Sequence, residues 1–76
     1  MEFKEFLVQK YNLGDSFAKD YVGRFNGIDN KGIYKGENEM TQSLIVAVEK
    51  EFPNSKNHYL LALERYIEFQ KEAKKQ

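Results

Sequence analysis

The sequence predicts an all-α fold: a compact bundle of four helices in two helical hairpins, with a turn-rich loop between the second and third helices. Two observations predict it. Apolar residues recur at helical spacing in four segments, and Gly, Asn or Pro residues separate those segments. A chain of 76 residues forms one domain, and a fold this small buries only about 60% of its unfolded surface. Six Phe and five Tyr supply apolar volume for the core.

An apolar stripe defines each of the first two helices. The first is predicted over residues 2–11, with a stripe of Phe3, Phe6, Leu7 and Tyr11. Gly14 is expected to end it, because glycine commonly follows the last helical turn. The second is expected to begin at a cap, Asp15 or Ser16, and its apolar face consists of Phe17, Ala18, Tyr21, Val22, Phe25 and Ile28. Gly23 in this helix either permits close approach of another backbone or is a tolerated surface glycine.

The next segment, residues 26–35, is rich in Asn, Gly and Asp and is predicted to form turns. Ile33 and Tyr34 within it are expected to fold back onto the core, and a short hairpin is the less favoured alternative. The third helix is predicted over residues 37–52, and its apolar face consists of Met40, Leu44, Ala47, Val48 and Phe52. Pro53 is expected to stop it, because proline disfavours helical geometry in the residue before it.

The fourth helix has the widest apolar face. It is expected to begin at a cap, Asn54 or Ser55. Its apolar residues are Tyr59, Leu60, Ala62, Leu63, Tyr66, Ile67 and Phe69. They cover about half of the circumference at about 3.6 residues per turn, so this helix is predicted to touch more than one neighbour and to be central. Residues 70–76 are expected to be a fraying tail.

Composition narrows the classes of protein. The first residues, "MEFKEFLVQKY", contain acidic side chains and no long apolar run, so they are not a signal peptide. No segment approaches the ~20 apolar residues that span a bilayer. The absence of cysteine excludes disulfides and thiolate metal sites and fits a reducing compartment. We therefore expect a cytoplasmic domain that has no membrane partner.

No catalytic or metal-binding set can be assembled from the residues. His58 is the single histidine, and no nucleophile, base and orienting group gather around it in the sequence. The "DNKG" segment at Asp29 resembles the start of a calcium loop, but Met40 occupies the twelfth position, where a bidentate Glu is needed. We therefore expect no enzyme, no catalytic residue, no metal, no cofactor and no small-molecule substrate.

Two segments carry a family resemblance. "SFAKDYVGRFNGI" followed by "NSKNHYLLALERYIEF" resembles the N-terminal core-binding domain of phage-type integrases, the tyrosine recombinases. The pattern in the second segment consists of Ser55, Tyr59, Ala62, Leu63, Arg65, Tyr66 and Phe69. The resemblance covers Phe3 to Phe69 and implies a SAM-like bundle that holds one side of a DNA duplex, with its second and fourth helices near the major groove.

When the DNA-contacting positions of this family are carried over to the sequence, the resemblance implies that six residues contact nucleic acid: Lys19, Arg24, Lys56, Asn57, His58 and Arg65. Two features depart from the family. The catalytic domain is missing from these residues, so this chain alone cannot perform recombination. The loop "NGIDNKGIYKGEN" is also long for such a bundle.

The fourth helix carries an acidic ladder: Glu64, Glu68 and Glu72, spaced four residues apart. Carboxylates repel phosphate, so DNA contact is expected only at the first two turns of this helix, whose N-terminus favours anions. A solvated face is the plainer interpretation of such a charge run. The formal net charge of zero also argues against a dedicated nucleic-acid binder.

The alternative function is a protein-interaction module. Val46 and Leu61 project from polar helix faces, and together with Tyr34 they would form a small docking patch beside Glu64 and Glu68. A small phage or mobile-element protein that binds and modulates a host nuclease or recombinase would fit this alternative. The sequence favours DNA binding slightly, because the resemblance includes both helices that would contact the duplex.

Overall fold

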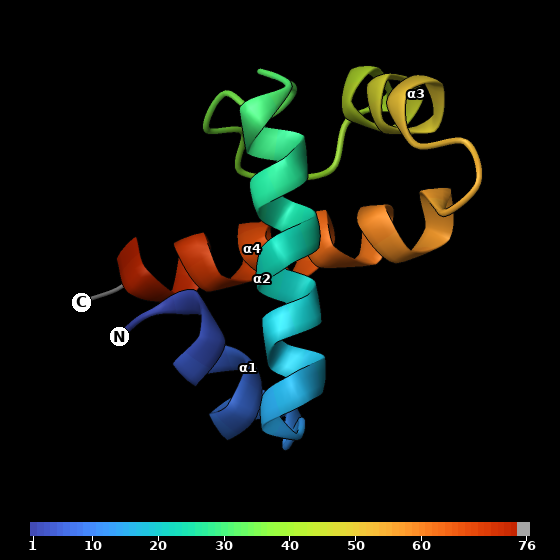
Figure 1. Ribbon diagram of the computed structural model, residues 1–76. Helices are drawn as coiled ribbons and strands as arrows, with labels where there is room; N and C mark the ends of the chain where they lie inside the picture. The colour runs from blue at the N-terminus through green and yellow to red at the C-terminus, as the bar shows by residue number, and fades with distance from the viewer. Residues whose placement is uncertain (75–76) are drawn as a thin grey trace.

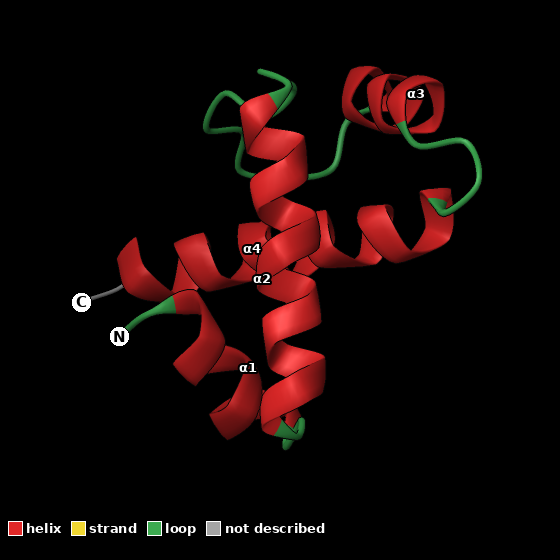
Figure 2. Cartoon of the chain, in the orientation of Figure 1, coloured by secondary structure: helices red, strands yellow, loops and turns green. Residues whose placement is uncertain are grey.

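The computed structural model describes residues 1–74, which contain four α-helices and no strand (Figures 1 and 2). The helices are α1 (Phe3–Tyr11), α2 (Asp15–Asn30), α3 (Gln42–Glu51) and α4 (Lys56–Lys74). In Figure 1, α2 crosses α4 at a steep angle, with α1 and α3 on opposite sides of α4. Because α4 contacts the other three helices, its predicted central position is confirmed, as is the all-α four-helix bundle.

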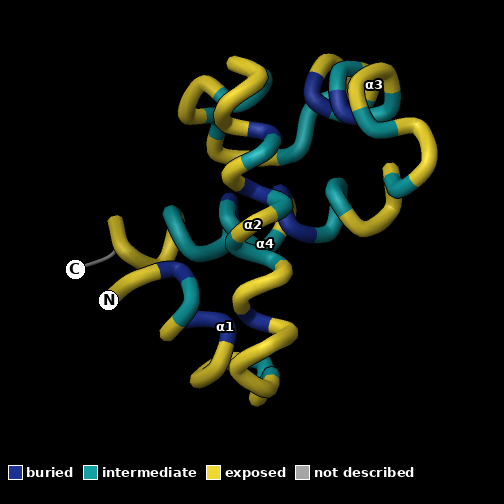
Figure 3. The backbone as a smooth tube through the Cα atoms, viewed as in Figure 1, coloured by how far each residue is buried: buried dark blue, intermediate teal, exposed yellow. Residues whose placement is uncertain are grey.

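Every helix contributes to the core. Its buried residues are Phe3, Phe6, Leu7, Ala18, Phe25, Ile28, Leu44, Val48, Ala62, Leu63 and Ile67, and Figure 3 shows how these buried positions follow the inner side of each helix. The predicted apolar faces are confirmed except at Phe17, whose side chain is 65% exposed. Phe17 has nearly the same angular position on α2 as the buried Ile28, but it lies in the first turn of the helix, where its side chain is exposed.

Aromatic rings form the centre of this core. The rings of Phe25 and Tyr66 stack with centroids 3.6 Å apart and an interplanar angle of 11°. Phe3 meets Tyr66 edge-on at 5.1 Å, and Tyr34 meets it edge-on at 5.6 Å. Ile33 also packs against the core, so the prediction that residues 33 and 34 fold back is confirmed.

The turn between α1 and α2 differs from the prediction. Asn12, not Gly14, adopts the left-handed conformation that ends α1, with φ 53°. Asparagine tolerates this conformation because its short polar side chain can hydrogen-bond locally. Gly14 is extended and caps α2 without a side-chain hydrogen bond, so the predicted caps Asp15 and Ser16 were wrong. Helix α2 begins directly at Asp15.

Helix α2 is longer than predicted, because residues 26–30 are helical rather than a turn. Burial of Ile28 holds this extension in the helix despite its poor helix formers. A Cβ atom at Gly27 would lie 3.6 Å from the Tyr59 ring and 3.8 Å from the Phe52 ring. These are ordinary contacts with side chains, and Gly23 has open space around it, so the close backbone approach considered for Gly23 does not occur and Gly23 is a tolerated surface glycine.

Helix α3 is shorter than predicted and begins five residues later than residue 37. Its N-cap is Thr41, whose hydroxyl accepts a hydrogen bond from the Leu44 N–H at 3.2 Å. The helix ends at Glu51, before Phe52 and Pro53, and so confirms the predicted stop.

Helix α4 begins where predicted, and the Ser55 carbonyl accepts a hydrogen bond from the Tyr59 N–H at 3.1 Å. It continues to Lys74, so the predicted tail is helical over residues 70–74, and its last two residues, 75 and 76, lie outside the described range. Within residues 1–74, no helix has the length and apolar character needed to cross a membrane.

Candidate functional site

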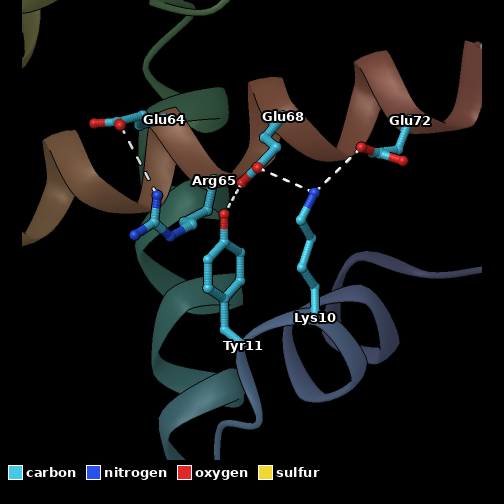
Figure 4. A network of polar contacts seen from close by, with 6 residues as sticks. All are labelled: Lys10, Tyr11, Glu64, Arg65, Glu68 and Glu72. Carbon is cyan, nitrogen blue, oxygen red and sulfur yellow. Dashed lines mark hydrogen bonds and ion pairs between the residues drawn. The ribbon is translucent and has the colours of Figure 1, made fainter.

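A polar network joins the end of α1 to the C-terminal half of α4 (Figure 4). Glu68 and Glu72 lie four residues apart on one side of α4, and Lys10 projects toward both from α1. The Lys10 Nζ lies 3.3 Å from a Glu68 oxygen and 3.2 Å from a Glu72 oxygen. The Tyr11 hydroxyl donates a hydrogen bond to the other Glu68 oxygen. The Arg65 guanidinium lies over the Tyr11 ring, 4.3 Å from its centroid.

These contacts set the charge of the network. Burial acts to raise the pKa of Glu68. Hydrogen bonds from Tyr11 and Lys10, together with the positive charges of Lys10 and Arg65, outweigh burial and lower this pKa below its usual value. Burial and the hydrogen bond to Glu68 raise the pKa of Tyr11. Hydrogen bonds to Glu72 and Glu68 raise the pKa of Lys10. At neutral pH the network therefore contains ionised Glu68, protonated Lys10 and neutral Tyr11.

The outer side of this network opens into a groove of about 410 Å³ between α4 and the loop before α3. We call it the acidic groove, and it is lined by Glu39, Met40, Glu64, Arg65, Ile67, Glu68, Lys71 and Glu72. Its apolar lining consists of the half-buried Met40 and of the small part of Ile67, 4% exposed, that is not covered by the core. Four carboxylates against two cations give the lining a charge of −2, which Lys10 partly offsets.

A second hollow, of about 320 Å³, lies between α1 and the end of α4. We call it the aromatic pocket, and it is lined by Met1, Phe6, Gln9, Lys10, Phe69, Glu72 and Ala73. The Phe6 and Phe69 rings lie 5.4 Å apart between centroids. Glu72 lines both the pocket and the groove, so the two hollows meet at this residue.

The residues predicted to contact nucleic acid do not form one surface. Lys19 pairs with Asp15 of its own helix at 3.3 Å, and Lys56 pairs with Glu49 of α3 at 3.6 Å. Arg65 is held against Tyr11 of α1. Lys19 and Arg24 lie about 140° apart around α2, because five residues separate them. Three of these residues, Lys56, Asn57 and His58, do remain together and exposed in the first turn of α4.

The residues predicted to bind a protein partner differ in their exposure. Tyr34 belongs to the aromatic core, and its hydroxyl donates a hydrogen bond to the Glu37 carbonyl at 2.9 Å. Val46 is 52% exposed on α3 and Leu61 is half-buried on α4. Glu64 is exposed on the groove, as a solvated face requires, but that interpretation is wrong for Glu68, which is half-buried in the network.

Several residues of the groove and its network have no signal in the sequence. Glu39 and Met40 fall within the predicted third helix, yet they form the loop wall of the groove. Lys10 and Tyr11 gave no signal beyond the apolar stripe of α1, because their partners lie more than 50 positions away in the chain. The ladder spacing identified only the α4 side of the groove. In residues 1–74, no cluster of three or more His, Asp or Glu side chains has an arrangement that could hold a metal ion.

Comparison of the chain with protein-family models, with curated proteins and with solved structures found no match. The resemblance to integrase core-binding domains therefore stays a prediction.

Proposed function

We propose that this chain is a non-catalytic interaction module whose acidic groove binds a basic segment of a protein partner. One observation carries this proposal: four carboxylates from two separate parts of the chain surround a hollow that has apolar surface at Met40 and Ile67. A Lys or Arg of the partner would form charge-assisted hydrogen bonds with these carboxylates. Apolar side chains of the same segment would cover Met40 and Ile67.

The position of Lys10 supports a basic partner. An ammonium group from α1 already lies between Glu68 and Glu72, so the ladder binds a side-chain cation in the folded chain. Glu39 and Glu64 line the same groove and are both exposed. Glu64 has only Arg65, at 3.8 Å, as an ion-pair partner among the described residues. These two carboxylates are the ones that a partner can bind without breaking the contact between α1 and α4.

DNA binding is the second candidate, and the exposed first turn of α4 favours it. Lys56, Asn57 and His58 stand at the N-terminus of a 19-residue helix, where backbone N–H groups and the helix dipole favour a phosphate. Against it, Lys19 and Lys56 are each paired with a carboxylate, and the net charge is zero.

A fluorescence anisotropy titration with a labelled peptide of alternating Lys and Leu tests the first candidate. Each exposed charge pair contributes about 0.2–1 kcal/mol, so the double variant Glu39→Gln/Glu64→Gln is expected to weaken binding about twofold to thirtyfold. Glu5→Gln removes the same charge from the exposed side of α1, away from the groove, and serves as the control. Equal affinity of both variants for the peptide would contradict a groove site.

The same titration with duplex DNA at low and physiological salt tests the second candidate. A DNA-binding module loses affinity steeply as salt rises, because each phosphate contact releases counterions. Charge reversal at Lys19, Arg24 and Lys56 would weaken that binding without changing helicity. Absence of DNA binding at low salt would remove this candidate.

A further inference from the structure

The aromatic pocket adjoins the acidic groove, and Glu72 lines both. We propose that the aromatic pocket receives one apolar side chain of the partner segment whose basic residues occupy the acidic groove. This inference rests on the proposed function and makes it more specific. It describes the partner segment as an apolar anchor residue that is flanked by Lys or Arg.

The volume and lining of the pocket fit a single large side chain. Its volume of about 320 Å³ lies near the lower end of the range for ligand pockets. The aromatic surface that the pocket offers is mainly the half-buried ring of Phe69, which is tilted by 54° to the ring of the buried Phe6 behind it. A further ring can pack against Phe69 offset or edge-on, which are the arrangements that aromatic rings prefer. Anchors of this kind carry much of the binding energy in protein interfaces.

The charges at the mouth of the pocket specify the residues beside the anchor. Lys10 and Glu72 line the pocket and pair with each other, and Glu68 contacts Lys10 from the side of the groove. Two carboxylates against one ammonium leave an excess of one negative charge where the pocket meets the groove. A Lys or Arg next to the anchor would be attracted there, and an Asp or Glu would be repelled.

Lys10 also gives the site an internal competitor. Its ammonium occupies the position between Glu68 and Glu72 that a cation beside the anchor would approach. Replacement by methionine keeps an unbranched apolar side chain but removes the charge. We expect Lys10→Met to bind a basic peptide about threefold to tenfold more tightly, because Glu72 loses its ion pair and Glu68 keeps only the hydrogen bond from Tyr11.

A ¹⁵N–¹H chemical-shift titration of the full chain tests the proposal with two peptides, Lys-Lys-Phe-Lys-Lys and Lys-Lys-Ala-Lys-Lys. The Phe peptide is expected to bind about tenfold more tightly, because its ring is buried in the pocket. It should also shift the amide resonances of Phe6, Gln9 and Ala73, which the Ala peptide leaves in place.

Ala73→Leu fills the pocket from an exposed helical position, and Ser43→Leu adds the same side chain to the exposed side of α3 as a control. We expect Ala73→Leu to remove the advantage of the Phe peptide and Ser43→Leu to retain it. Circular dichroism establishes that both variants keep their helices, and the shifts in the unmodified chain locate the peptide independently of any variant.

The outcomes separate this inference from the function on which it rests. If both peptides bind the acidic groove equally, and the Glu39→Gln/Glu64→Gln variant weakens both, the anchor pocket is wrong and the proposed function stands. If the Phe peptide binds more tightly but Ala73→Leu leaves that advantage intact, the pocket is also wrong. If neither peptide binds, the proposed function fails, and the anchor pocket fails with it.

Discussion

Helix α4 packs on its neighbours along both of its halves, but the two halves use different contacts. In the C-terminal half, Tyr66 stacks on Phe25 of α2 and meets Phe3 of α1 edge-on, while Glu68 accepts hydrogen bonds from α1. In the N-terminal half, Tyr59 stacks on Phe52 at 3.9 Å, and Lys56 pairs with Glu49 of α3. The first junction combines buried rings with a polar network, whereas the second combines one half-buried ring pair and one exposed ion pair with the buried aliphatic side chains Leu44 and Val48.

This difference indicates where the molecule is most firmly held. Local stability follows buried apolar contact, and regions with few such contacts open most easily. Helix α3 contributes only Leu44 and Val48 to the buried core, and it contacts α4 but has little contact with α1 or α2. We therefore expect α3 and the first turns of α4 to open before the α1–α2–α4 unit. The acidic groove lies at the border between the two, with α4 as its firm wall.

The largest expected effect comes from removing a ring from each junction. Phe25→Ala leaves a cavity beside Tyr66 and should lower the free energy of unfolding by about 3–5 kcal/mol. Phe52→Ala should cost less, about 2 kcal/mol, because that side chain is only half-buried. Urea unfolding followed by far-ultraviolet circular dichroism measures both. Equal losses would show that the two junctions contribute alike.

A smaller effect is expected from the tyrosine hydroxyls. Tyr11→Phe removes the donor to Glu68 but keeps the ring under Arg65, so it should lower stability by about 1 kcal/mol. Tyr59→Phe is the matched change in the other junction, where the hydroxyl makes no hydrogen bond to residues 1–74, and it should be close to neutral. If Tyr59→Phe proves the more costly of the two, the polar network does not stabilise the first junction.

The two helical glycines of α2 allow a gain in stability. Gly23→Ala enters open space in a helix interior and should stabilise the chain by about 0.5–1 kcal/mol. Gly27→Ala brings a methyl group to 3.6 Å from Tyr59, an ordinary contact, and should gain no more than Gly23→Ala. Thermal unfolding of both variants ranks them. A loss at Gly27 alone would show that the second junction is packed more tightly than its few contacts suggest.

The smallest expected effect is the pH dependence of the network. Because the folded chain lowers the pKa of Glu68, this carboxylate stabilises the fold above its unfolded pKa, and that stability is lost as pH falls through the lower, folded pKa. Lys10 and Tyr11 have raised pKa values, so their contributions are present below pH 10 and are lost at more alkaline pH. Stability measured from pH 3 to pH 7 should vary less in Glu68→Gln than in Glu64→Gln. An identical profile in both variants would exclude Glu68 as the source.

Much of the fold could be predicted from the sequence, because apolar spacing identifies a helix and the face that it buries. Element ends were less predictable. Residues 26–30 have the composition of a turn but remain helical because Ile28 is buried, and Thr41 rather than Glu37 determines where α3 begins. Phe17 fits the spacing of the buried face, but it lies in the first turn of α2 and its side chain is exposed there, which spacing alone does not reveal.

The candidate site was predicted only in part. The ladder of Glu64, Glu68 and Glu72 could be read from one helix, since i, i+4 spacing is a local property. The residues that lie beside this ladder could not be predicted, because Lys10, Tyr11 and Glu39 approach α4 only in the tertiary fold. The resemblance implies its six residues only by their position in a motif, and position does not account for ion pairs such as that between Lys56 and Glu49.

The two stacked ring pairs make the junctions of α4 separately observable. The chain contains no Trp, and each stacked pair joins one Tyr to one Phe, Tyr66 on Phe25 and Tyr59 on Phe52. A fluorine atom introduced into the tyrosine rings would lie within the ring current of a different phenyl group in each half of α4. The ¹⁹F resonances of Tyr66 and Tyr59, among those of the five tyrosines, would then report the opening of each junction on its own within one sample.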